Sequence, residues 1–179
     1  MVKAKTIGFV TLLIFLVSCV GSPGTTVTPT PPPYINEERE GGSLGGIWYL
    51  EDIDCQITPK SSRITFQMRE MGPGQPYYRV VEVYNDQVLF PSQPDRSQYD
   101  PSWGEARIDL LVSDLYGYEY DWSELPLACP DSPVVIKVGH YPTYDDAILG
   151  FSIGLKQAAP YQVLTLEDPV RLVVEVQTD

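Results

Sequence analysis

The chain has 179 residues, 12 basic and 24 acidic side chains, and a formal net charge of −12 at pH 7. This charge argues against nucleic acid as a partner and against electrostatic adhesion to anionic lipid or teichoic acid. It favours neutral glycans, basic partners or cations, and the length suffices for one domain with a hydrophobic core.

Residues 1–18 have the pattern of an export signal. Lys3 and Lys5 give a basic start, and the apolar run from Ile7 to Val17 is too short to span a bilayer. Leu16 lies three positions before Cys19 and the small Ser18 directly before it, which resembles the lipobox of bacterial lipoproteins. The resemblance implies cleavage before Cys19 and lipidation of its thiol, so we expect a membrane partner through a lipid anchor. An ordinary secretory signal with an incidental cysteine, or an uncleaved anchor, are the alternatives.

Residues 19–44 read as a tether that follows the lipidated N-terminus. The segment 22–34 is rich in proline and threonine and cannot form a core, and GGSLGG follows at 41–46. We therefore expect an extended, disordered spacer over 19–44 and a folded domain over 45–179.

Cys55 and Cys129 remain as an even pair once Cys19 is set aside. An exported protein meets an oxidising compartment, so we expect a disulfide between them, with two free buried thiols as the alternative. The chain contains no Cys-x-x-Cys, and we expect no metal or other cofactor.

Apolar residues alternate with polar ones through much of 46–179, as is typical of half-buried strands. Ile64, Phe66 and Met68 fall on one face of the clearest example, and no long stretch has an apolar period of 3.6. These short strands predict an all-β fold, a β-sandwich or barrel, and we favour a β-sandwich of two mainly antiparallel sheets. The expected strands cover 63–68, 77–84, 88–90, 108–112, 134–138, 148–155, 161–166 and 170–176.

Two passages resemble one another at a distance. Residues 76–88 and 160–170 each begin with Pro-Tyr and read as a hairpin. Such a repeat is compatible with a sandwich built from two related halves, and chance similarity between valine-rich hairpins is the alternative.

The domain also resembles a known family. Residues 160–163 (PYQV) followed by 168–176 (DPVRLVVEV) are similar to the paired motifs of AMIN-like domains in exported bacterial lipoproteins. Residues 62–66, 76–80 and 147–155 are similar to other strands of that family. Related AMIN domains are β-sandwiches that attach cell-wall amidases and secretins to peptidoglycan, so the resemblance implies peptidoglycan binding at the cell envelope.

Tyr116, Tyr118, Tyr120 and Trp122 occupy alternate positions and would share one face of an extended strand. Aromatic rings stack on sugar rings, and the intervening Glu119 and Asp121 could bond sugar hydroxyls. The sequence thus offers these four residues as ligand-binding, with a place at the edge of the core as the alternative.

Arg63 and Arg171 each stand at the start of a strand and could bind a peptide carboxylate through a bidentate contact. A structural pairing with a nearby Asp or Glu is the alternative.

The signals for an enzyme are weak. His140 is the only histidine, which favours a hydrogen-bonding role at a strand end, and the motifs of zinc proteases, serine hydrolases and nucleotide loops are missing. We expect a non-catalytic, lipid-anchored envelope module that binds cell-wall glycan or peptide, or an envelope protein. A small carboxylate-based hydrolase, to which Asp145 and Asp146 could contribute, and a purely structural lipoprotein are the alternatives.

Overall fold

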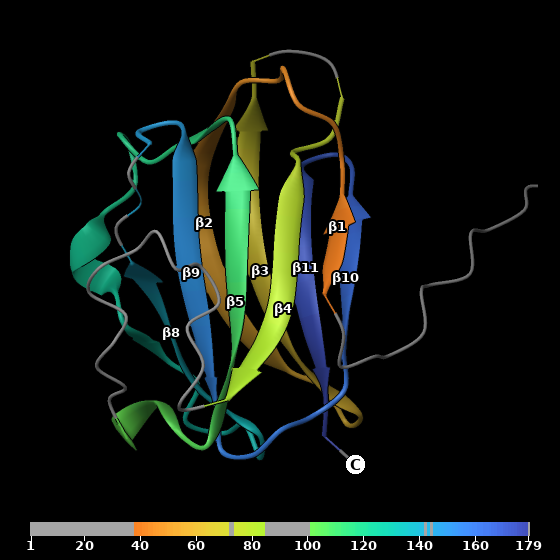
Figure 1. Cartoon of the computed structure of the whole chain (residues 1–179), viewed down its shortest axis with the longest axis vertical. Helices are drawn as coiled ribbons and strands as arrows, with labels where there is room; N and C mark the ends of the chain where they lie inside the picture. Colours follow the sequence, from red (N-terminus) through yellow and green to blue (C-terminus); the bar gives the residue numbers. More distant parts are fainter. Residues whose placement is uncertain (1–37, 72–73, 85–100, 142, 144, 179) are drawn as a thin grey trace, which may run out of the picture. The chain divides into compact units, whose positions relative to one another are not determined.

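The protein is a sandwich of two β-sheets, and the computed structural model describes residues 38–71, 74–84, 101–141, 143 and 145–178 (Figure 1). The first sheet has the order β1-β4-β5-β9-β8-β7 and the second β10-β11-β3-β2-β6. All pairings within them are antiparallel except that of β2 with β6, so the predicted all-β sandwich is confirmed. The first sheet comprises β1 (Arg39–Gly41), β4 (Tyr78–Tyr84), β5 (Ala106–Ser113), β9 (Ile148–Leu155), β8 (Val135–Tyr141) and β7 (Leu127–Ala128). The second comprises β10 (Tyr161–Leu166), β11 (Val170–Gln177), β3 (Ser61–Glu70), β2 (Trp48–Ile57) and β6 (Leu115–Tyr116).

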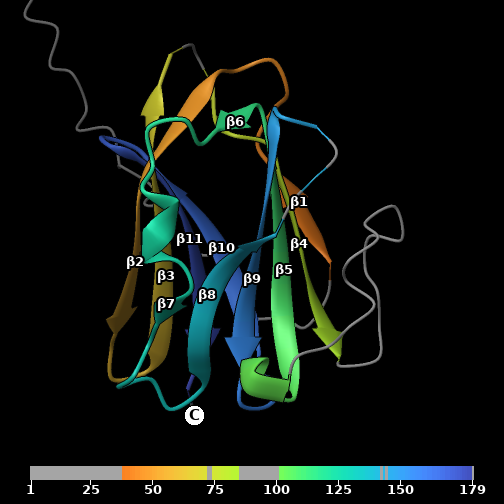
Figure 2. The same cartoon turned by 90° about the vertical axis from the view of Figure 1, so that its left-hand side faces the viewer.

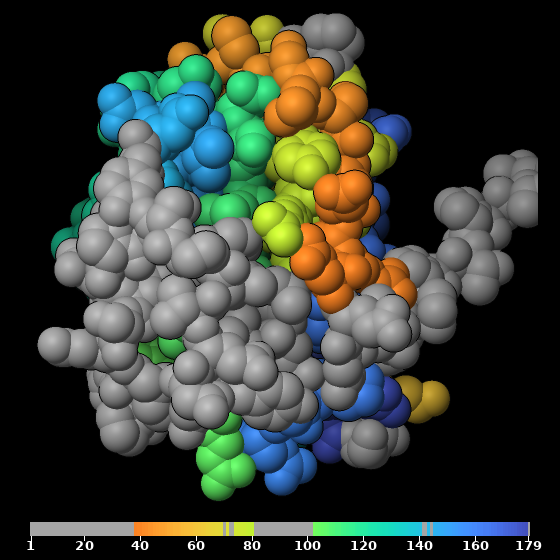
Figure 3. All heavy atoms as spheres, in the orientation of Figure 1, coloured from red at the N-terminus to blue at the C-terminus, as the bar shows by residue number. Residues whose placement is uncertain are grey.

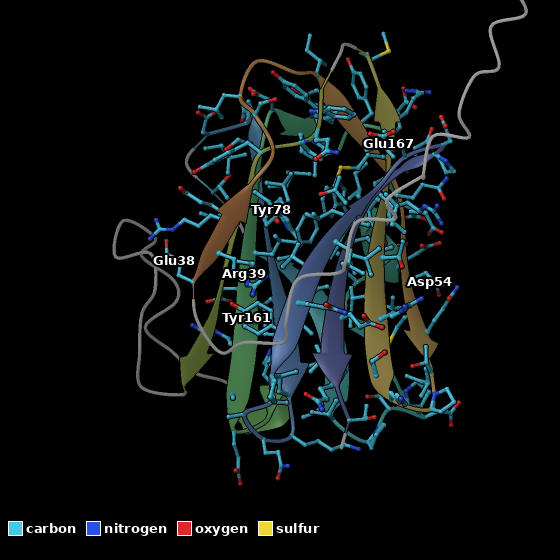
Figure 4. All side chains as sticks on the ribbon, turned by 90° about the vertical axis from the view of Figure 1, so that its right-hand side faces the viewer. Glu38, Arg39, Asp54, Tyr78, Tyr161 and Glu167 are labelled. Atoms are coloured by element: carbon cyan, nitrogen blue, oxygen red, sulfur yellow. A yellow bond between two sulfur atoms is a disulfide. The ribbon has the colours of Figure 1, made fainter. Side chains whose placement is uncertain are left out.

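The core lies between the two sheets. Ile64, Phe66 and Met68 of β3 point inward as their alternation predicts, and the Phe66 ring lies 4.8 Å from that of Phe151 on the opposite sheet. Tyr78 and Tyr161 also point between the sheets, whereas Asp54 lies on the outer side of β2 (Figure 4). The Tyr161 hydroxyl donates to the Val80 carbonyl at 3.4 Å, which links the two layers by a polar contact.

The folded domain begins earlier than the sequence indicates. Residues 39–41, inside the predicted tether 19–44, form β1 and pair with β4, so the expected boundary at residue 45 is wrong for these residues. Gly42 has a φ of 77°, and a Cβ there would lie 2.1 Å from the Pro76 carbonyl oxygen. The glycine-rich stretch therefore makes a close turn against the domain. Figure 3 shows the atoms of β1 (orange) against those of the first residues of β4 (yellow-green), with which β1 pairs.

The segment from β6 to β7 crosses from one sheet to the other and corrects the prediction of a single extended aromatic strand. β6 pairs with β2 of the second sheet, and β7 pairs with β8 of the first. The short 3-10 helix η3 (Trp122–Glu124) lies between them, on the side of the sandwich that Figure 2 faces. Asp121 caps η3 by accepting from the Ser123 amide, which ends the extended pattern.

The Cys55–Cys129 disulfide joins β2 to the residue after β7, with α-carbons 5.9 Å apart. The predicted pairing is therefore confirmed. The bond lies where the crossing segment reaches the first sheet, so it holds both sheets and the end of that segment together.

The two similar passages lie in different sheets. β10 and β11 form the expected hairpin in the second sheet, whereas the strand of the earlier passage is β4 in the first. The remainder of that passage, with the expected strand 88–90, lies outside the described residues, as do residues 1–18 and Cys19. Within the described part of the chain, no helix is long and apolar enough to cross a membrane.

Candidate functional site

A hollow of about 460 Å³ lies where the crossing segment meets the ends of β8 and β9. Aromatic, imidazole and carboxylate groups line it together, and we call it the aromatic hollow. Its lining residues are Gly117, Tyr118, Trp122, His140, Thr143, Asp145, Asp146, Ile148 and Leu149.

Trp122 and His140 form one wall of this hollow. Their ring centroids lie 4.4 Å apart, and the Trp122 Nε1 group donates to the Gly117 carbonyl at 3.0 Å. A Cβ at residue 117 would lie 2.1 Å from the Trp122 ring, so a glycine there is what lets the indole approach. The His140 ring also contacts that of Phe151, and desolvation by this packing lowers the pKa of the imidazole. A neutral imidazole can both donate and accept a hydrogen bond.

Tyr118 is the exposed aromatic group of the hollow, with 75% of its surface accessible. Its ring stacks on that of Tyr116 at 5.8 Å, and Tyr116 in turn contacts Tyr49 at 6.0 Å. The Tyr118 ring is thus held by a neighbouring ring while its surface remains available, as a ring-shaped ligand would require.

Tyr120 departs from the predicted row, because it is 6% exposed and belongs to the core. Its ring meets the Trp122 indole edge-on at 5.1 Å. The four aromatic residues therefore do not share one face. Tyr118 and Trp122 line the hollow, Tyr116 supports Tyr118, and Tyr120 packs beneath Trp122.

The carboxylates of the hollow come from the turn that leads into β9. The Asp145 Oδ1 atom accepts from the Ala147 amide at 2.9 Å, and Asp145 and Asp146 are both exposed. Both residues line the hollow, so their carboxylates are available to a ligand bound there. The sequence analysis named these two residues only as acids that could serve a hydrolase, because the neighbouring sequence does not indicate that they lie beside Tyr118 and Trp122.

A smaller hollow of about 200 Å³ adjoins the first and shares Trp122 and His140 with it. Trp103 also lines this smaller hollow, and the Lys137 Nζ group lies 4.4 Å from the centre of the Trp103 ring. Sequence reasoning missed Trp103. The sequence feature that could have indicated it is the pair of glycines at positions 139 and 154, which leave room for a large residue. A Cβ at 139 would lie 2.4 Å from the Trp103 ring, and a Cβ at 154 would lie 2.5 Å from the Trp103 carbonyl oxygen.

Arg63 and Arg171 lie elsewhere, on the outer face of the second sheet. Both line a groove of about 410 Å³ that shares no residue with the aromatic hollow. Arg63 Nε donates to Glu175 Oε1 at 2.7 Å, which is the structural pairing that the sequence left open as the alternative to a ligand contact. Burial alone would raise the pKa of Glu175, but hydrogen bonds from Ser61, Arg63 and Gln162 outweigh it and lower the pKa.

The aromatic hollow can stack a ring and bond its hydroxyl groups through carboxylates, an imidazole and a tyrosine. Among the described residues, no three His, Cys, Asp or Glu side chains converge as a metal site. No family model, no curated protein and no solved structure matches this chain.

Proposed function

We propose that the protein is a non-catalytic, lipid-anchored module of the bacterial cell envelope that binds cell-wall glycan through the aromatic hollow. The observation that carries this proposal is the exposed Tyr118 ring beside the Trp122–His140 pair, with Asp145 and Asp146 in the same hollow. Aromatic faces suit the apolar faces of sugar rings, and the polar groups suit hydroxyls.

Three further observations support it. The lipobox-like sequence before Cys19 supports an extracytoplasmic location and a lipid anchor, and the disulfide is compatible with an oxidising compartment. The resemblance to AMIN-like domains supplies peptidoglycan as the candidate wall polymer. The net charge of −12 disfavours polyanionic wall polymers and leaves neutral glycan.

A pull-down on purified cell wall tests the proposal, with titration of an N-acetylglucosamine tetramer as the soluble probe. Tyr118→Ala should weaken binding by roughly 0.5–1.5 kcal/mol, because one ring contact is lost. Tyr118→Phe should retain most of the affinity, since stacking needs only the ring. Leu44→Ala is the control, because Leu44 is 68% exposed and lies outside the hollow. Unchanged binding by Tyr118→Ala would refute this site.

A carboxylate-based hydrolase is the second candidate, and the observation that favours it is the presence of Asp145 and Asp146 beside Tyr118 and Trp122 in one concave hollow. Glycosidases use two carboxylates that flank the scissile bond. Release of soluble fragments from purified cell wall by the full chain, abolished in Asp146→Asn, would establish this activity in place of binding alone.

A further inference from the structure

The outer face of the second sheet carries a groove whose side chains change in character from strand to strand. β2 contributes acids, β3 contributes uncharged polar groups beside Arg63, and β10 contributes leucines. Cross-strand pairing sets two parallel rows across the sheet (the second sheet is seen in Figure 4). One row is Asp52, Gln67, Arg171 and Leu166, and the other is Asp54, Thr65, Val173 and Leu164.

The charges of this groove are unevenly paired. Arg63 is neutralised by Glu175, whereas Arg171 Nε donates to the Pro169 carbonyl at 3.3 Å, a neutral acceptor. Among the described residues, no salt bridge involves Arg171, Asp52 or Asp54. Asp52 and Arg171 are separated by one strand, and neighbouring strands lie about 4.8 Å apart, so the two positions are about 10 Å apart.

We propose that this groove binds a short zwitterionic peptide that lies across the strands. Its ammonium group contacts Asp52 and Asp54, its terminal carboxylate contacts the Arg171 guanidinium, and an apolar last side chain packs on Leu164 and Leu166. A span of about 10 Å matches about three extended residues at 3.3–3.6 Å each. The side chains of Thr65 and Gln67 then lie beneath the peptide amides, for which they offer both donors and acceptors.

Charge complementarity selects this ligand over a neutral glycan, which has neither an ammonium nor a carboxylate group to satisfy the two ends. The site is independent of the proposed glycan function, because the groove and the aromatic hollow have no residue in common.

Calorimetric titration of the full chain in detergent with the peptide Ala-Ala-Leu tests the proposal. We expect binding, with affinity reduced about tenfold or more for the N-acetylated peptide and for the C-terminal amide, because each removes one charge-assisted contact. No binding of the free peptide, or equal binding of all three forms, would overturn the proposal.

Two variants assign the ends of the peptide. Arg171→Gln should weaken binding of the free peptide about tenfold or more. It should leave the affinity of the C-terminal amide unchanged, since the amide has no carboxylate to contact Arg171. Asp52→Asn should weaken binding of the free peptide about tenfold or more and leave the affinity of the acetylated peptide unchanged, since the ammonium contact is already absent there. Lys60→Gln is the matched control for loss of a surface charge, because Lys60 is exposed and outside the groove. Melting temperatures confirm that each variant is folded, and equal affinity of Arg171→Gln and wild type for the free peptide would reject the carboxylate contact.

Discussion

The Glu175 carboxylate is a buried charge on the outer face of the second sheet, and three side chains donate hydrogen bonds to it. Ser61 Oγ donates to it at 2.6 Å and Arg63 Nε at 2.7 Å, and Gln162 donates to its other oxygen. Because the folded state lowers the pKa of this carboxyl, the stabilisation is present above the unfolded pKa and is lost as the pH falls through the folded pKa.

Glu175→Gln should therefore reduce the free energy of unfolding at pH 7 by about 1–3 kcal/mol and flatten its decline in acid. Urea unfolding at pH 7 and at pH 3 measures both effects. Glu167→Gln, at an exposed position, serves as the control. An acid limb of the same steepness in Glu175→Gln and wild type would contradict the assignment.

Tyr118 and Tyr120 should respond oppositely to truncation, although they are two residues apart. Tyr120 is 6% exposed, so Tyr120→Ala should cost about 3–5 kcal/mol of stability, as for other large aromatic side chains in a core. Tyr118→Ala should change stability by less than about 0.5 kcal/mol, because its ring is largely in solvent. Thermal melts of the two variants distinguish them, and similar losses in both would show that Tyr118 belongs to the core.

The Cys55–Cys129 bond closes a loop between residues 74 positions apart. On the chain-entropy model, such a loop stabilises the fold by about 4 kcal/mol. The paired change Cys55→Ser and Cys129→Ser should lower the melting temperature accordingly, and a reducing agent should do the same to the wild type alone. If the reducing agent affected wild type and paired variant equally, the bond would not be the cause.

The strands that the sequence predicted well have either an unbroken alternation, such as β3, or a dense run of β-branched and apolar residues, such as β11. β2 escaped prediction because a bulge between Leu50 and Asp52 shifts its register, so the buried Leu50 and Ile53 are three positions apart instead of two. For the aromatic segment the opposite mistake was made, because a strand was predicted beyond Tyr116, where the structure has none. Its spacing matched a strand, but the Asp121 cap and the space at Gly117 turn it into a crossing.

The start of the folded domain can be tested by deletion. β1 pairs with β4 at three positions, and Tyr77 Oη donates to Glu40 at 2.8 Å. Removal of residues 20–44 should lower the melting temperature by several degrees, since a loss of 1 kcal/mol shifts it by about 2–4 °C in a domain of this size. Removal of 20–36 should leave it unchanged. Equal melting temperatures for the two deletions would show that β1 adds nothing to stability.

Lipidation at Cys19 is a separate prediction about the N-terminal end of the chain. Intact-mass analysis of the membrane fraction should show loss of residues 1–18 and the added mass of lipid. Cys19→Ala should leave the precursor without lipid. A lipidated Cys19→Ala protein would contradict the assignment of this cysteine.

The candidate site was only partly predictable, because its residues meet through the fold. Sequence spacing identified Tyr118 and Trp122, yet the partners that complete the hollow lie on β8 and on the turn before β9. Arg63 and Arg171 were recognised individually, but only the strand register places Asp52 on the same groove. Local pattern reveals which side chains suit a ligand, and sheet pairing decides which of them act together.

The crossing segment is attached to both sheets by backbone pairing, one at each of its ends. Residues 115–116 are bound to one sheet and 127–128 to the other, and the aromatic hollow lies between these attachments. A ligand seated against Trp122 and His140 would therefore contact the crossing segment and β8 of the first sheet at the same time. Because a ligand that binds only the folded state stabilises it, such a ligand would oppose separation of the crossing segment from the first sheet, and hydrogen exchange of residues 117–126 should slow when it is bound.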